Sequence, residues 1–232
     1  MIKMKSFKDF TNSVDDIGLY KRVGGRLGSN PAGVYEKNGE QFYIKHSHSN
    51  DHAHNEVLAS KLYKLAGSPV IDQNLIHTGA GKLGTISKME KLTTFNPHNK
   101  SHLSAIQDHI ATHAWTSNWD TVGLENDNQA HDTNGNMKTV DVGGALRYRA
   151  QGGPKGEAFG DHPTEMKTFK DSKINPEAAH VFGNISPETE RNSIQRIKAI
   201  PDESIRDTVK QYSTPEHADT LTKTLIARKN NL

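Results

Sequence analysis

The chain has 232 residues, of which 33% are hydrophobic and 6% aromatic, and its 29 Lys and Arg against 27 Asp and Glu leave a net charge of +2. This length allows one large or two small domains with a sizeable core, and the near-neutral charge argues against a nucleic-acid partner. The absence of cysteine excludes disulfides, thiolate metal sites and a cysteine nucleophile.

No apolar stretch approaches the 18 residues of a membrane span. The N-terminal residues are charged and lack the apolar core of a Sec signal. We therefore expect no membrane span and a protein that is cytoplasmic as synthesised, with Sec-independent secretion into a host cell left open.

The first part of the chain is predicted to form strands around one helix. After the weakly patterned residues 1–20, residues 22–45 are typical of strand, glycine turn and strand, and Asn38-Gly39 is a strong hairpin signal. A helix is expected at about 52–66, because apolar residues recur at helical spacing before Gly67 and Pro69. Further strands are expected at 70–76 and 82–89.

The rest of the chain is predicted to be mainly helical. A polar, proline-containing segment at 93–100 indicates a boundary between an N-lobe, residues 1–92, and a C-lobe, residues 93–232. The pattern predicts a helix at 103–115, a loop at 119–129, a hairpin at Asn134-Gly135 with a strand at 137–142, an irregular loop at 151–165, and helices starting near Pro176, Ser186, Pro201 and Pro215. The predicted fold class is α+β with two lobes.

A phosphate-binding site is indicated by a glycine-rich turn and a lysine. Glycines let backbone N–H groups approach phosphate oxygens, although this stretch lacks the G-x-G-x-x-G spacing. Lys45 ends a strand in which Phe42 and Ile44 share one face, so its side chain points with Tyr43 to the other. Glu56, early in the following helix, is expected to pair with Lys45. The candidate phosphate-binding residues of the turn are Gly24, Gly25, Gly28, Ser29, Asn30 and Gly33.

Oxygen ligands for a cation follow in the second half. Asp141 ends an apolar strand, where a carboxylate is costly unless it pairs or binds a metal. Asn128 offers a neutral oxygen, and Mg²⁺ prefers such ligands. Asp120 is expected to be anchored by a buried Trp119 and to take the proton of an acceptor hydroxyl. Asp127 is a spare acid for either role.

The 13 histidines allow a zinc site as an alternative. His46, His48, His52 and His54 lie close together, and His109 and His113 are one helical turn apart. No H-E-x-x-H motif occurs, and no G-x-S-x-G elbow indicates a serine hydrolase.

These features together resemble the divergent protein-kinase-like superfamily, which includes HipA-type toxin kinases and phosphatidylinositol 3- and 4-kinases, and in particular small bacterial kinase-like domains of secreted effectors and phage-linked proteins. The resemblance spans residues 24–161 or so. The matching stretches are 28–33 (Gly-Ser-Asn-Pro-Ala-Gly), 43–45 (Tyr-Ile-Lys), 55–59 (Asn-Glu-Val-Leu-Ala), 118–128 (Asn-Trp-Asp-Thr-Val-Gly-Leu-Glu-Asn-Asp-Asn) and 140–152, which begins Val-Asp-Val-Gly-Gly.

The resemblance implies a two-lobed protein-kinase-like fold that binds ATP and Mg²⁺ between its lobes. Lys45 would hold phosphates, Glu56 would orient Lys45, and Asp120 would be the catalytic acid. Asn128 and Asp141 would bind the metal, with Asp127 as a further ligand or the acid in place of Asp120. The segment 87–92, with Met89, Glu90 and Leu92, would face adenine.

Some positions depart from the family pattern. The spacing from Asp120 to Asn128 is wider than usual, no His-Arg-Asp anchor is present, and Val142 replaces the usual Phe. We predict an ATP-dependent kinase acting on a Ser or Thr hydroxyl of a protein, with a host protein as one candidate. The alternatives are a phosphoinositide kinase or an AMP transferase of the same fold, and a catalytically inactive binding module.

Overall fold

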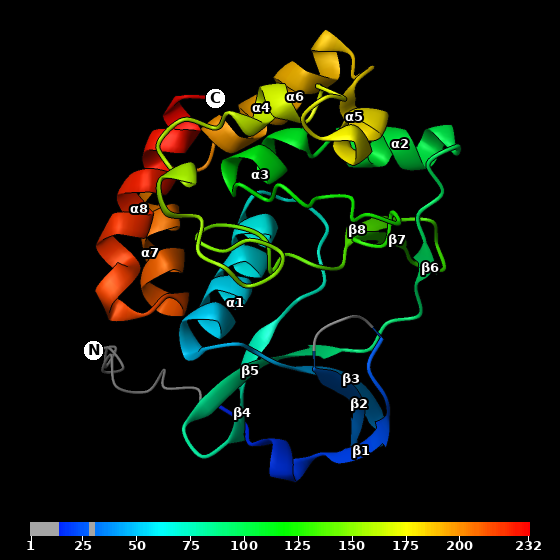
Figure 1. Ribbon diagram of the computed structural model, residues 1–232, viewed down its shortest axis with the longest axis vertical. Coiled ribbons are helices and arrows are strands. Elements are labelled where there is room, and N and C mark those ends of the chain that lie inside the picture. Colours follow the sequence, from blue (N-terminus) through cyan, green and yellow to red (C-terminus); the bar gives the residue numbers. More distant parts are fainter. Residues whose placement is uncertain (1–13, 28–30) are drawn as a thin grey trace, which may run out of the picture.

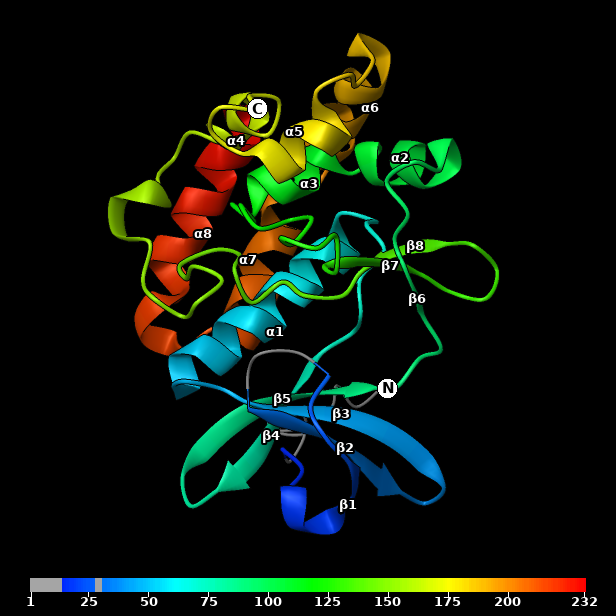
Figure 2. The same cartoon turned by 45° about the vertical axis from the view of Figure 1, so that its right-hand side comes forward.

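The structure is a computed structural model that describes residues 14–27 and 31–232. A five-stranded sheet forms one end of the molecule and helices form most of the other, with α1 (Asn50–Leu65) between them (Figure 1 and Figure 2). The architecture is α+β, as predicted.

The sheet has the order β1-β2-β3-β5-β4, and all of its neighbouring strands are antiparallel. The predicted hairpin is present: Asn38 and Gly39 have φ values of 55° and 79°, which suit a tight turn between two twisted strands. Ile44 is fully buried on one face of β3, with Ile76 and Ile86 beside it. A 3₁₀ helix, η2 (Ile17–Leu19), precedes the strands β1 (Lys21–Gly24), β2 (Ala32–Lys37), β3 (Glu40–His46), β4 (Asn74–Gly79) and β5 (Lys82–Lys88).

The strand expected at 70–76 begins only at Asn74, so this prediction was wrong at its start. The backbone of residues 69–71 pairs instead with Thr139 of β8 (Met137–Thr139). The amide of Ile71 donates to the carbonyl of Thr139 at 3.0 Å, and that of Thr139 donates to Pro69 at 3.1 Å. A backbone that is already bonded there cannot also extend the five-stranded sheet.

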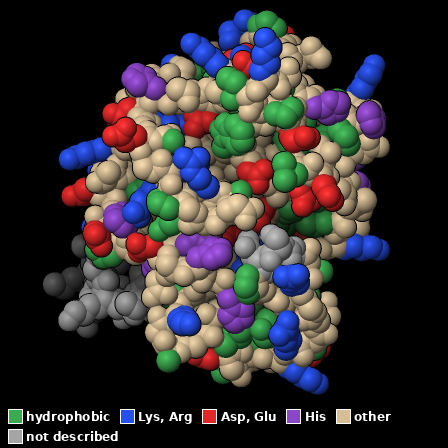
Figure 3. Space-filling view, in the orientation of Figure 1, with side chains coloured by type: hydrophobic (Ala, Val, Ile, Leu, Met, Phe, Trp, Pro, Cys, Tyr) green, Lys and Arg blue, Asp and Glu red, His purple; other side chains and the backbone are tan. Residues whose placement is uncertain are grey.

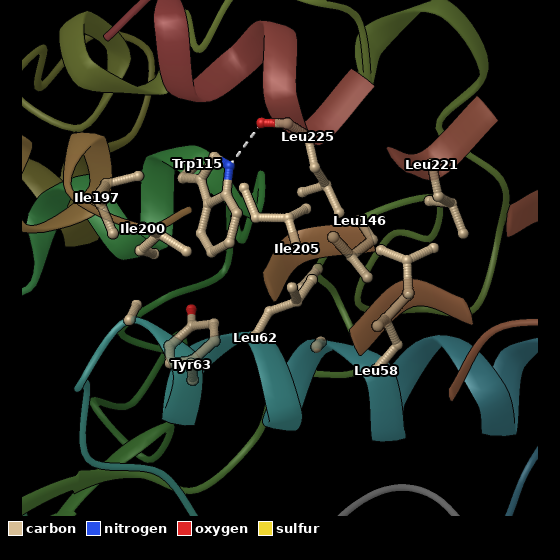
Figure 4. Packing of buried hydrophobic residues seen from close by; sticks show 14 of the residues in the cluster. Leu58, Leu62, Tyr63, Trp115, Leu146, Ile197, Ile200, Ile205, Leu221 and Leu225 are labelled. Carbon is tan, nitrogen blue, oxygen red and sulfur yellow. Dashed lines mark hydrogen bonds between the residues drawn. The ribbon is translucent and has the colours of Figure 1, made fainter. Parts of the chain in front are cut away.

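Helix α1 is capped at both ends by local chemistry. The Ser49 side chain accepts the His52 amide at its start, and Gly67, with φ 67°, follows its end. The helix packs its apolar face on the C-terminal helices, where Leu58 and Leu62 meet Trp115 and Leu225 (Figure 4). The indole N–H of Trp115 donates to the Leu225 carbonyl at 2.8 Å. α1 is therefore fixed to the helical part while its other side faces the sheet.

The helices of the second part begin close to the predicted prolines and serine. The helix expected at 103–115 is broken in two, because α2 ends at Gln107 and α3 starts at Ile110. The turn at Asp108 and His109 brings His109 Nδ1 within 3.0 Å of Ser68 Oγ. The helices are α2 (Lys100–Gln107), α3 (Ile110–Trp115), α4 (Glu165–Thr168), α5 (Pro176–Phe182), α6 (Pro187–Lys198), α7 (Asp202–Tyr212) and α8 (Pro215–Asn230), and the loop at 151–165 holds a second 3₁₀ helix, η3 (Gly156–Ala158).

A second sheet, in the order β6-β7-β8, lies beside the helices and contains the expected hairpin at Asn134-Gly135. Its last strand stops at Thr139, short of the predicted end at residue 142, because Val142 turns into the core. β6 joins this sheet, so we propose the lobe boundary between residues 92 and 93. Among the residues that the structure describes, no helix is long and apolar enough to cross a membrane. The strands are β6 (Thr93–Thr94), β7 (Gln129–His131) and β8 (Met137–Thr139).

Candidate active site

Lys45 lies at the centre of the site, between two carboxylates from different parts of the chain. Its Nζ lies 2.7 Å from Glu56 Oε1 and 3.2 Å from Asp141 Oδ2. Glu56 is 3% exposed, in the part of α1 that faces the sheet. The structure therefore brings together the three charged residues that the sequence analysis singled out for pairing and metal binding.

Lys45 and Asp141 both favour their charged forms in this cluster. Burial disfavours the Lys45 ammonium, but the attraction of Asp141 and Glu56 outweighs it, so the pKa of Lys45 is raised above its usual value. Burial likewise opposes the Asp141 carboxylate, yet Lys45 and the Gly143 amide hold the pKa of Asp141 below its usual value. The Gly143 N–H donates to Asp141 Oδ1 at 2.8 Å.

Glycine at 143 allows this close arrangement. A Cβ at this position would lie 3.2 Å from Asp141 Oδ1 and 3.5 Å from Glu56 Oε2. An alanine here would press on Asp141 Oδ1 by a few tenths of an ångström while making ordinary contact with Glu56, so the position leaves little room for a side chain.

A cavity of about 310 Å³ opens beside this cluster. Lys45 and Tyr43 both line it, which confirms the strand face predicted from the alternation in β3. Figure 3 shows acidic side chains gathered on this side of the molecule, between its two parts. The cavity lining also contains Asn118, Asp120, Gly123, Leu124, Glu125, Asp127, Asn128, Asp141, Gly144, Ala150 and Gln151.

Asp120 and Asp127 both reach the cavity but differ in environment. Asp127 is exposed, whereas Asp120 is partly buried. Burial raises the pKa of Asp120, a hydrogen bond with Asn128 opposes this shift, and the charges of Asp141 and Asp127 add smaller increases. The Asn128 amide nitrogen donates to the Asp120 carbonyl at 2.6 Å, which leaves its side-chain oxygen to accept or to bind a cation. This environment fits Asp120 better than Asp127 as a proton acceptor.

The Asp120 loop is not anchored in the way we predicted. Trp119 is 45% exposed, so the expectation of a buried aromatic there was wrong. The neighbouring Asn118 is buried instead, and its side-chain amide donates to the Tyr63 hydroxyl of α1 at 3.0 Å. A polar side chain buried with a hydrogen-bond partner can hold a loop as firmly as an apolar one.

The structure describes only part of the glycine-rich turn. Gly28, Ser29 and Asn30 fall outside the described residues. The Leu27 amide donates to the Tyr43 hydroxyl at 3.0 Å, so Leu27 lies on the same face of β3 as Lys45. Gly25 has open space around it.

Gly33 is placed differently from the rest of the turn. It lies inside β2, opposite Ile44. A Cβ at this position would come within 3.0 Å of both the Arg22 and Tyr35 side chains. Crowding within the sheet therefore explains this glycine, and phosphate contact is not needed to account for it.

The predicted adenine-facing segment is not part of the cavity lining. The Met89 amide donates to the Gln41 carbonyl at 2.9 Å, and Glu90 pairs with Lys138. Leu92 is partly buried. The segment thus joins the two parts of the chain, and its role toward a nucleotide base stays a prediction.

His54, His109 and His113 of the zinc alternative have hydrogen-bond partners of other kinds. His113 Nδ1 lies 2.8 Å from the Tyr63 hydroxyl, and burial lowers the pKa of His113 to about 3, so its ring is neutral. Within residues 14–27 and 31–232, no group of three or more His, Cys, Asp or Glu side chains is placed to hold a metal by itself.

The donor set does fit a magnesium–nucleotide complex. The cavity lining holds four carboxylates and one lysine, so a polyphosphate alone would be repelled there. Asp141, Asn128 and Asp127 line the cavity with side-chain oxygens of the kind that Mg²⁺ prefers, and this ion usually takes one or two protein carboxylates and completes its shell with phosphate and water. A site with few protein ligands is therefore the kind of site this ion uses.

Asn55 and Lys155 are site residues that sequence reasoning missed. Asn55, next to Glu56, donates from Nδ2 to the Ala145 carbonyl at 2.9 Å and accepts the Arg147 amide at 3.1 Å. It thereby ties α1 to the segment that follows Asp141. The only sequence signal for it was its place in the Asn-Glu stretch of the family resemblance.

Comparisons with known proteins establish the fold. The Helicobacter pylori proinflammatory kinase CtkA has a similar structure, with a TM-score of 0.61 and 12% identity over 94% of this chain and 95% of that one. An aminoglycoside phosphotransferase from Alicyclobacillus acidocaldarius matches with a TM-score of 0.39 and 9% identity over 93% and 91% of the two chains. The chain has a protein-kinase-like fold. The sequence matches no family model and no curated protein.

Proposed function

We propose that this protein is an ATP-dependent kinase that transfers the γ-phosphate to a Ser or Thr hydroxyl of a protein substrate. The observation that carries the proposal is the position of Lys45, which pairs with both Glu56 and Asp141 at the wall of an acidic cavity. Phosphoryl transfer depends mainly on positioning and electrostatic stabilisation, and these residues supply both.

Each residue has a distinct proposed role. Lys45 binds phosphate oxygens, and Glu56 holds its ammonium in place. Asp141 and Asn128 would hold Mg²⁺, which would supply positive charge against the phosphates. Asp120 accepts the proton of the attacking hydroxyl, because its partly buried carboxylate has a raised pKa and lies in the same cavity.

The structural likeness to CtkA, which is named a proinflammatory kinase, supports a kinase fold, and a protein acceptor, with a host protein as one candidate, is our proposal. The nucleotide-binding residues of the proposal include the turn residues Gly25, Gly28, Ser29, Asn30 and Gly33 and the connecting residues Met89, Glu90 and Leu92. The chain offers no observation that favours a lipid acceptor.

A phosphate-transfer assay with radiolabelled ATP and Mg²⁺ tests the proposal. Wild type should label itself or a generic protein substrate, and Asp141→Ala should reduce labelling to background. Equal labelling by both proteins would refute it. Asp132→Ala is a suitable control, since Asp132 is an aspartate near a strand end whose hydrogen bonds go to Asn134 and Asn136.

The mass of the product separates kinase activity from AMP transfer, because a phosphate and an AMP group add different masses. Thermal melts with and without ATP and Mg²⁺ separate an enzyme from an inactive module. A ligand that binds only the folded state raises its stability, so an unchanged melting temperature at saturating nucleotide would favour the inactive module.

A further inference from the structure

A buried lysine lies directly behind the site, in the loop at 151–165. Lys155 is 8% exposed, although a lysine in a Gly- and Pro-rich loop is usually solvated. The backbone around it is closed by hydrogen bonds, since the Lys155 amide donates to the Arg147 carbonyl at 2.7 Å and the Arg149 amide donates to Gly153 at 2.7 Å. This closed turn aims the side chain into the molecule.

The Lys155 ammonium joins the two loops that carry the proposed catalytic groups. Its Nζ donates to the Ser117 carbonyl, to the Gly144 carbonyl at 2.8 Å and to Ser117 Oγ at 3.3 Å. Ser117 lies shortly before Asp120, and Gly144 lies shortly after Asp141. An ammonium has three donors, and here each has an acceptor.

A second network holds Ser117 from behind. Its hydroxyl donates to Glu165 Oε1 at 2.5 Å, and Glu165 Oε2 pairs with Arg228 of α8 at 2.6 Å. Arg228 also donates to the carbonyls of Trp115 and Ala114 at the end of α3. Ser117, Glu165, Arg228 and Lys155 thus form one buried polar network. Within it, Lys155 makes the contact with the Asp141 loop, through the Gly144 carbonyl.

We propose that Lys155 is the positioning residue that fixes the Asp120 loop and the Asp141 loop to each other, a role that rests on the kinase function proposed above. It replaces the His-Arg-Asp anchor that the sequence lacks. The Leu146 amide, which donates to the Thr116 carbonyl at 2.6 Å, is the backbone link that this clamp protects.

Burial acts against the charge of Lys155. Burial, together with Arg228 and Arg149, lowers the pKa of Lys155 to about 7, while Glu165 opposes the shift. The charged groups that face it are thus Glu165 of α4, Arg228 of α8 and Arg149 of its own loop. A pKa below the usual value for lysine means that the closed state favours the neutral amine more than water does, so the stability of the closed clamp relative to an opened one increases as pH rises above about 7.

Hydrogen exchange of backbone amides tests the clamp without any nucleotide. In Lys155→Met, the amides of Gly143 and Leu146 should exchange roughly 10- to 100-fold faster, the range expected for losing a hydrogen bond to a charged group. Lys155→Gln, which keeps two donors, should show a smaller increase. The matched control is Lys229→Met, because Lys229 is 7% exposed and donates to the Ile200 carbonyl, away from both loops.

Unchanged exchange at Leu146 in Lys155→Met, or an equal increase along the whole chain, would overturn the proposal. If that variant does not fold, wild type decides: the protection of Leu146 relative to Leu225 should rise as pH increases above about 7, because the opened clamp, with Lys155 in water, binds a proton that the closed clamp has lost. A constant ratio would overturn the proposal.

Kinetics provide the readout that a merely structural role would not change. Lys155→Gln should lower kcat while the KM for ATP stays close to that of wild type. A wild type that transfers no phosphate would remove the proposed function, but the exchange result would still stand on its own.

Discussion

Replacement of Glu56 by glutamine tests the electrostatic reasoning at the site most directly. The variant keeps the shape of a side chain that is 3% exposed but removes one of the two negative charges beside the Lys45 ammonium. Breaking a buried pair costs about 3–5 kcal/mol when the remaining charge has no partner. Lys45 retains Asp141 at 3.2 Å, so we expect a smaller loss of about 2 kcal/mol, near the value of a hydrogen bond to a charged group.

This loss should appear in both stability and activity. For a chain of this size it lowers the melting temperature by about 4–8 °C. The ammonium should also shift toward Asp141, and a displacement of this kind costs roughly 100-fold in kcat/KM. Because the pKa of Lys45 is raised on folding, its contribution to stability is fully present below its unfolded-state pKa and is lost only at higher pH. The difference in stability should therefore be the same at pH 6 and pH 8.

Glu40→Gln is the matched control, because Glu40 pairs with Lys88 on the same sheet but both side chains are more than half exposed. An exposed pair contributes about 0–1 kcal/mol, so this variant should remain close to wild type in melting temperature and kcat/KM. Wild-type kcat/KM in Glu56→Gln, or an equal effect of both substitutions, would refute the reasoning.

Three further predictions follow from contacts around the site. Asn55→Ala should lower the free energy of unfolding, measured by urea titration, by roughly 2 kcal/mol, because two hydrogen bonds to the backbone are lost. Asp127→Asn should retain activity, and the pH at which its kcat falls on the acid side should be lower than in wild type, since a negative charge that raises the pKa of Asp120 is removed. Asp120→Asn should instead lower kcat by about 10²–10⁴-fold. If the pH–rate profiles show the opposite pattern for the two variants, Asp127 is the base. Arg228→Met should cost about 3–5 kcal/mol in urea unfolding by leaving Glu165 buried without its partner, and a loss below 1 kcal/mol would contradict this.

Local chemistry made much of the fold predictable from sequence. The Asn38-Gly39 turn fixes the β2–β3 hairpin, and the alternation along β3 then decides which face Lys45 occupies. Helix starts after proline and serine are similarly local, because the capping groups are neighbours in the chain. Each of these features depends on residues only a few positions apart.

The wrong predictions concern segments whose partners lie far away in the chain. Residues 70 and 71 look like the start of a strand, but their backbone pairs with Thr139. Trp119 looks like a core residue, but Asn118 takes the buried position beside Tyr63. Hydrophobic patterning alone cannot choose between two neighbours when a polar residue finds a hydrogen-bond partner inside.

Lys155 shows why part of the site could not be predicted at all. Nothing around it in the sequence distinguishes it from a surface lysine, since its burial depends on carbonyls supplied by Ser117 and Gly144. The missing His-Arg-Asp motif indicated only that some anchor had to exist. Under our proposal, the Asp120 loop and the Asp141 loop are joined by a cationic side chain that donates to the backbone of both. Such a side chain can come from any segment that folds behind the two loops. In this chain it comes from the loop after Asp141, and the C-terminal helix supports it through Arg228 and Glu165. The geometry of the proposed catalytic residues therefore depends on the last helix of the chain as much as on the residues beside them.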